Sequence, residues 1–229
     1  MRGLFVTGTD TGVGKTVLSA ALLAAIAASG EPARAYKPVV TGLEEPPGEW
    51  PPDHALLAQA AGMEPDEVAP LRYRPAVSPH LAAELAGERI DPARVLGAAR
   101  AAGATGTLIV EGVGGLLVPL TERYAVRDLA AELGLPVVVA ARPGLGTINH
   151  TLLTIEAARA LRLCVCAVVL TPWPAEPSSM ERSNRETIAE LGNVEVATLP
   201  YVPAPEVAAL AHAGEALPWR RWLAREPGA

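Results

Sequence analysis

Lysine is nearly missing from this sequence. Only Lys15 and Lys37 are lysines, and the other positively charged side chains are 17 arginines. Asparagine and glutamine are also scarce, whereas there are 22 prolines. Such a composition fits a thermophilic protein, although a GC-rich genome would give a similar one. Lysine supplies a compact point charge and arginine a bulky planar fork, so the two lysines mark positions where arginine would not serve.

Other absences exclude whole classes of function. The net charge of −6 argues against nucleic acid as the main partner, because binding to a phosphate backbone needs a basic face. The longest apolar run, VLSAALLAAIAA, is too short to span a bilayer, and the N-terminus lacks a signal-peptide core. We therefore expect a soluble, cytoplasmic protein with neither a membrane nor a nucleic-acid partner. Cys164 and Cys166 have no second ligand pair nearby, and we expect both to be buried core residues.

Short apolar runs alternate with helical patterns along the chain. This alternation predicts an α/β fold: one domain over residues 1–229, with a parallel sheet covered by helices on both faces. The proline-rich stretch 42–53 interrupts the pattern as a loop rather than as a domain linker. The expected strands are 3–7, 33–38, 107–111, 136–141, 163–170 and 194–200, and the expected helices are 15–30, 53–62, 78–87, 91–103, 126–134, 147–162 and 178–192.

The segment VTGTDTGVGKT follows the first strand and opens a helix, which is the setting of a phosphate-binding loop. Backbone N–H groups of residues 12–14 can point at a polyphosphate beside the positive helix end. Lys15 would reach the outer phosphates, and the Thr16 hydroxyl would bind Mg²⁺. Five residues instead of four separate Gly8 from the Gly-Lys pair, so the loop is a variant. A glycine-rich turn without a ligand is the weaker alternative.

Charged residues follow two of the expected strands. Glu111 ends an apolar strand, and a carboxylate at the carboxyl edge of a parallel sheet needs a cation. Lys37 ends another strand and should project at the same edge, although it could also be a solvated strand-end lysine. Asp53 precedes a helix, and its local sequence alone favours the role of an N-cap over that of a metal ligand. The four histidines show no metal-ligand spacing, and each is expected on the surface or in the core.

The phosphate loop resembles that of the dethiobiotin synthetases of biotin biosynthesis. YKPVVTG, SPH, VEGVGGLLVPL, GLGTINHTLLT and LPYVP extend the resemblance in the family's order over most of the chain. The resemblance implies a P-loop NTPase-like fold, a homodimer and an ATP- and Mg²⁺-dependent cyclo-ligase. The implied reaction closes the cyclic urea of dethiobiotin from 7,8-diaminopelargonate and CO₂ or bicarbonate, and releases ADP and phosphate.

The resemblance also implies roles for individual residues. Catalysis is assigned to Lys37, Lys15 and Thr11, and the metal to Thr16, Asp53 and Glu111. The diamine is assigned to Thr41 and to a helix opening from the second subunit, made of Gly146, Thr147, Ile148 and Asn149. The nucleotide is assigned to Gly12, Val13, Gly14, Lys15, Thr16, Val17, Asp53, Glu111, Gly112, Val113, Gly114, Thr171, Pro200, Tyr201, Val202 and Glu206. On these roles, Lys37→Ala should fold normally and lose most of its turnover.

One departure and several alternatives stand beside this interpretation. Thr171-Pro172 replaces the Asn-Asp pair that reads adenine in the family, so the base preference is open. A switch ATPase related to ParA or MinD would need a lysine at the position of Asp10, and a GTPase would need a lysine in its guanine motif. An amidoligase related to the cobyrinate enzymes would need a further domain. A nucleotide-binding module without catalysis stays open.

Overall fold

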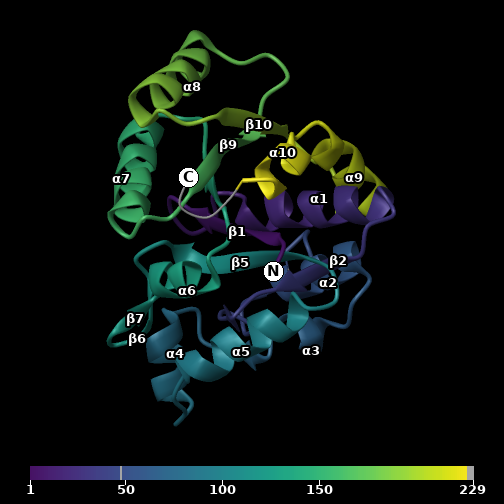
Figure 1. Cartoon of the computed structure of the whole chain (residues 1–229), viewed down its shortest axis with the longest axis vertical. Coiled ribbons are helices and arrows are strands. Elements are labelled where there is room, and N and C mark those ends of the chain that lie inside the picture. Colours follow the sequence, from purple (N-terminus) through teal and green to yellow (C-terminus); the bar gives the residue numbers. More distant parts are fainter. Residues whose placement is uncertain (47, 226–229) are drawn as a thin grey trace.

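Six parallel strands form the central sheet of the computed structural model, which describes residues 1–46 and 48–225 (Figure 1). Their order across the sheet is β10-β9-β8-β1-β5-β2. All six strands expected from the sequence are present, and β5 and β9 run further than expected. The bounds are β1 Gly3–Gly8, β2 Ala33–Tyr36, β5 Thr107–Gly115, β8 Val137–Ala141, β9 Val165–Trp173 and β10 Val196–Pro200.

Helices cover both faces of this sheet, as the sequence predicts (Figure 1). Strand residues alternate between the two resulting cores: Leu4 and Val6 face one, and Phe5 faces the other. The first core is closed by α1 (Lys15–Ala28), α2 (Asp53–Ala61), α3 (Pro65–Val68), α9 (Val207–Glu215) and α10 (Trp219–Leu223). The second is closed by α4 (Pro79–Leu85), α5 (Pro92–Ala102), α6 (Val126–Leu133), α7 (Thr147–Ala160) and α8 (Ser179–Gly192).

The strand register brings the ends of β1, β5 and β2 to the same level. Val6 of β1 pairs with Glu111 of β5, and Tyr36 of β2 pairs with Val110. Lys37, the residue after Tyr36, therefore emerges level with Glu111. Because all six strands are parallel, the phosphate loop after β1 opens at the same edge.

Several small elements and the C-terminal helices were not predicted. The small elements include α3 and two two-stranded sheets, which pair β3 (Val39–Val40) with β4 (Leu71–Arg72) and β6 (Pro119–Thr121) with β7 (Tyr124–Ala125). No element was expected after residue 203, yet α9 packs along α1, and Trp219 and Trp222 of α10 are buried in the first core. No helix in the described part of the chain is long and apolar enough to cross a membrane.

Three local expectations need correction or restriction. Asp53 is the first residue of α2 and Pro52 is its N-cap, so the N-cap interpretation of Asp53 is wrong. Cys166 is buried as expected, whereas Cys164 precedes β9 and is half-buried. Residues 43–46 and 48–52 form a loop without helix or strand, as expected. Pro47 of that loop and residues 226–229 of the expected domain lie outside the described residues.

Candidate active site

The phosphate loop joins β1 to α1 through two glycines in the left-handed region. Gly12 has φ +67° and Gly14 has φ +94°, a conformation that residues with a Cβ rarely adopt. A Cβ on Gly14 would also lie 2.7 Å from Cγ2 of Thr171, at the end of β9. Gly14 is therefore closely packed against Thr171, and the loop meets α1 at the helix end where free N–H groups favour an anion. The Lys15 ammonium donates to the Asp10 carbonyl at 2.8 Å.

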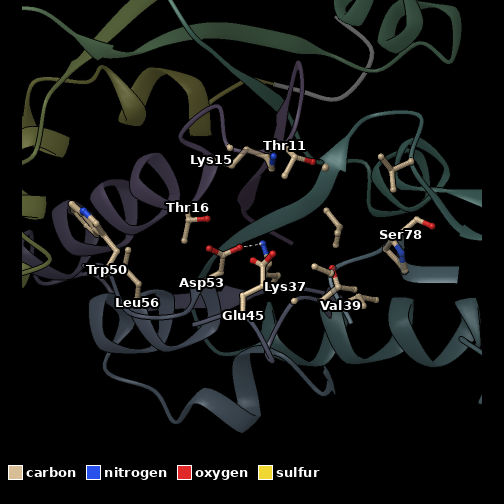
Figure 2. Close-up of a pocket in the computed structure, with 18 of the residues that line it drawn as sticks. Thr11, Lys15, Thr16, Lys37, Val39, Glu45, Trp50, Asp53, Leu56 and Ser78 are labelled. Carbon is tan, nitrogen blue, oxygen red and sulfur yellow. Dashed lines mark ion pairs between the residues drawn. The ribbon is translucent and has the colours of Figure 1, made fainter. Parts of the chain in front are cut away.

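A cavity of about 920 Å³ opens beside this loop at the carboxyl edge of the sheet (Figure 2). Figure 2 shows Trp50 and Leu56 at one end and Ser78 at the other, with Lys37 and Asp53 between them. Both lysines of the chain contribute to its wall, so Lys37 lies on the same edge as the phosphate loop. The sequence-predicted residues that line it are Thr11, Gly12, Gly14, Lys15, Thr16, Val17, Lys37, Thr41, Asp53, Val113 and Gly114.

Lys37 sits between two carboxylates. Its ammonium lies 2.9 Å from Asp53 Oδ2 and donates a hydrogen bond to Glu111 Oε1. Glu111 is fully buried, and its Oε1 also accepts from the Thr16 hydroxyl at 3.0 Å. Its other oxygen, Oε2, is buried without a hydrogen-bond partner among the described residues. The cluster thus links β5, α1, α2 and the residue after β2 through charged and polar contacts.

Burial and charge shift the pKa values of three of these groups. Burial lowers the pKa of Lys15, and the neighbouring ammonium of Lys37 lowers it further, against the opposing effect of Glu111. Burial would also lower the pKa of Lys37, but Glu111 and Asp53 outweigh it and raise that pKa above its usual range. Burial would raise the pKa of Asp53, but the Lys37 ammonium outweighs it and holds that pKa below its usual range. Lys37 is therefore a firmly protonated cation.

Known proteins resemble this chain over most of its length. A family model described as an AAA domain matches residues 2–207. The ATP-dependent dethiobiotin synthetase BioD of Anaeromyxobacter sp. (strain K) is 48% identical over 207 residues, which are 89% of this chain and 92% of that protein. The protein of the same name from Mycobacterium sp. (strain KMS) is 44% identical over 202 residues, 86% and 87% of the two chains. The chain belongs to the dethiobiotin synthetase family.

More distant structures share the fold. A ParA family ATPase from Chlorobium tepidum TLS superimposes with a TM-score of 0.54 at 14% sequence identity, over 95% of this chain and 92% of that one. At this identity the likeness concerns the fold alone, and it agrees with the P-loop NTPase-like architecture predicted from the sequence. Membership of the dethiobiotin synthetase family, and not the ParA likeness, bears on function.

The set assigned to the metal fits Mg²⁺. Thr16, Asp53 and Glu111 contribute oxygen atoms, and the unpartnered Oε2 of Glu111 is a buried acceptor that a cation would satisfy. In the described chain, no group of three or more His, Cys, Asp and Glu side chains could hold a metal on its own. Two carboxylates and a hydroxyl beside a phosphate loop match the way Mg²⁺ binds, with water and phosphate oxygens completing its shell.

The remaining predicted residues are not among the described residues that line the cavity. Thr171 is buried against Gly14, so it reaches the loop of the nucleotide site. Val13, Gly112 and Val202 are buried, whereas Pro200 at the end of β10 and Tyr201 and Glu206 before α9 are exposed. The start of α7, which the resemblance assigns to binding of the diamine, does not line the cavity within the described part of its own chain. There Thr147 is buried, Ile148 is half-buried, and Gly146 and Asn149 are exposed.

Some residues of the site were missed by sequence reasoning. Glu45 and Trp50, from the proline-rich loop, and Ser78, the N-cap of α4, line the cavity. The sequence marked the first two only as parts of a loop and Ser78 only as part of the SPH segment that resembles the family. Arg142, which follows β8, donates to the carbonyl of Gly12. Nothing in its local sequence distinguishes it from the other arginines.

Proposed function

We propose that this chain is an ATP- and Mg²⁺-dependent dethiobiotin synthetase. The reaction joins 7,8-diaminopelargonate and CO₂ into the cyclic urea of dethiobiotin and releases ADP and phosphate. One observation carries the proposal: the only two lysines, the phosphate loop and Asp53 line one cavity, where Lys37 also contacts the buried Glu111. Membership of the dethiobiotin synthetase family supports the same assignment.

The chemistry proceeds in three balanced steps. One amine of the diamine attacks CO₂ and loses a proton, which gives a carbamate. A carbamate oxygen then attacks the γ-phosphorus of ATP, and ADP leaves with the electrons of the broken P–O bond. The second amine attacks the carbonyl carbon of the resulting carbamic-phosphoric anhydride, expels phosphate, and loses a proton as the ring closes.

The difficult step brings an anionic carbamate to an anionic triphosphate. Catalysis here consists of holding the two in line and neutralising their charge. Lys15 approaches from the phosphate loop and Lys37 from the end of β2, so their ammonium groups can clamp the reacting oxygens from two sides. Thr11 and Thr41 line the same cavity and can hydrogen-bond the amines or the carbamate. Both lysines are buried, which restricts their ammonium groups before the substrates arrive.

Thr16, Asp53 and Glu111 would hold Mg²⁺ in this site. The ion would neutralise charge on the β- and γ-phosphates of ATP when bound. Lys37 contacts both carboxylates, so its ammonium would also lie beside the phosphates of a bound nucleotide.

The proposal includes a second subunit. The start of α7 lies outside the cavity of its own chain, and a helix N-terminus favours an anion, so a partner's α7 would receive the carboxylate of the diamine. A homodimer, one domain over residues 1–229 and a cytoplasmic location belong to this proposal. Because Thr171 and Pro172 replace the Asn-Asp pair of the family, activity assays with different nucleoside triphosphates are needed to determine the base preference.

The decisive assay measures ADP release by the purified protein. Release that requires 7,8-diaminopelargonate, bicarbonate and Mg²⁺ together, with dethiobiotin as the product, is the expected result. ATP hydrolysis that ignores the diamine, or that responds to DNA or to membranes, would indicate a switch ATPase instead. Sedimentation with and without substrates would test the homodimer separately.

A further inference from the structure

Arg142 contacts the phosphate loop from a neighbouring strand. Its Nη2 and Nε donate to the carbonyl oxygen of Gly12 at 2.9 and 3.3 Å. The contact follows from the sheet order, because β8 lies beside β1 and Thr9 N–H donates to the carbonyl of Ala140. Arg142, two residues further on, therefore emerges against the loop. It is outside the set of described residues that line the cavity, which includes Gly12 itself.

A hydrogen bond that fixes the carbonyl of one residue also fixes the N–H of the next residue, because the two groups belong to one planar peptide. In a planar trans peptide the C=O and the following N–H point in opposite directions. Arg142 is outside the described cavity lining, so a Gly12 carbonyl held by its guanidinium would face away from the cavity and the Val13 N–H would face toward it. That amide is one of the donors expected to meet the phosphates, and its orientation depends on a loop of flexible glycines.

We propose that Arg142 is a positioning residue for nucleotide binding, which orients the Val13 N–H by holding the Gly12 carbonyl. The positive charge of the guanidinium beside the carbonyl also polarises this peptide and strengthens the Val13 N–H as a donor. A rotation of the Gly12–Val13 peptide would turn its carbonyl toward the phosphates and repel them. The inference deepens the function proposed above, since it concerns the same nucleotide site.

The test replaces Arg142 by methionine, which keeps an unbranched chain and removes the charge and the donors. Arg142→Lys keeps the charge as a compact ammonium group without the planar fork of arginine. Arg159→Met is the matched control, because Arg159 is also exposed and also donates to a backbone carbonyl, that of Asn193 at 3.1 Å, at the far end of α7. Calorimetry with MgADP and MgATP, steady-state kinetics and the ¹⁵N amide resonance of Val13 provide the readouts.

We expect Arg142→Met to bind both nucleotides about tenfold more weakly, the loss typical of a hydrogen bond with a charged partner. The KM for ATP should rise, the KM for the diamine and kcat should stay near the wild-type values, and the Val13 resonance should move in the nucleotide-free protein. Arg142→Lys should recover part of the affinity. Arg159→Met should behave like the wild type in each assay.

Two results would overturn the inference. One is wild-type nucleotide affinity in Arg142→Met with an unmoved Val13 resonance. The other is weaker affinity with an unmoved resonance, which would show that the guanidinium contacts the phosphates directly. A wild-type protein that binds no nucleotide would refute the proposed function instead, so the two failures are distinguishable.

Discussion

Replacing Lys37 by methionine should destabilise the protein as well as inactivate it. The change removes the ammonium that faces Glu111 and keeps a side chain of similar length. Glu111 is 0% exposed and Lys37 4%, so the pair belongs to the buried class. Removing one partner of such a pair typically costs about 3–5 kcal/mol. We expect about 3 kcal/mol, because the Thr16 hydroxyl stays on Glu111 and the cavity admits water.

For a chain of this size that loss lowers Tm by roughly 6–12 °C. The experiment is urea unfolding followed by tryptophan fluorescence, without Mg²⁺ or nucleotide. The double variant Lys37→Met/Glu111→Gln is the critical control, because a neutral glutamine leaves no buried charge unpaired. It should recover at least half of the lost stability and none of the turnover. The sequence-based expectation that a Lys37 variant folds normally is revised accordingly.

A Lys37→Met protein with the urea midpoint of the wild type would refute this reasoning. So would a double variant no more stable than the single one, since the cost would then not come from the charge of Glu111. Of the two single variants and the double variant, Glu111→Gln should be destabilised least, because Lys37 keeps its contact with Asp53. The thermodynamic cycle of the four proteins gives the coupling between the two side chains.

Three further outcomes follow from the same contacts. Gly14→Ala should weaken MgADP binding at least about tenfold in titrations, because the left-handed backbone costs ~1–2 kcal/mol and the new methyl meets Thr171. Asp53→Asn should raise the Mg²⁺ concentration for half-maximal activity about tenfold, while unfolding changes by about 1 kcal/mol or less because this pair is partly exposed. A thiol reagent at pH 8 should modify Cys164 quickly and Cys166 only after unfolding, since burial raises the pKa of Cys166 to about 12. The Cys166 thiol ionises at a lower pH in the unfolded chain than in the folded protein. Burial of the neutral thiol therefore contributes fully to stability below about pH 9, and this contribution is lost as the pH rises toward 12.

The features of the fold and the site that could be predicted are those that a local pattern of residues determines. The strand–loop–helix order around Lys15 requires glycines at fixed positions, and the loop has them in left-handed conformations. Lys37 and Glu111 could be placed because parallel strands end at one edge, whatever the order of the strands. The alternation of apolar strands and helices likewise predicted both covering layers.

What failed depended on contacts between distant segments. Asp53 looked like a helix cap because its sequence neighbours form a helix, and its actual partner, Lys37, is brought there by the fold. Arg142 reaches Gly12 only because β8 and β1 are neighbours, which no short segment reveals. The helices after residue 203 are short and are held by packing of α9 on α1 and of Trp219 and Trp222 in the core. Tertiary contacts of this kind override local propensity.

The scarcity of lysine acquires a physical meaning in this fold. Both lysines are buried, at 6% and 4% exposure, whereas every arginine is half-buried or exposed. Arginine thus serves the surface and the outer contacts, including that of Arg142 on the phosphate loop. Inside the cavity, a compact ammonium fits between Asp53 and Glu111, where a planar guanidinium of five donors would need more room and more acceptors. On this argument Lys37→Arg should not restore turnover even though it keeps the charge, and an active Lys37→Arg enzyme would show that charge alone suffices at this position.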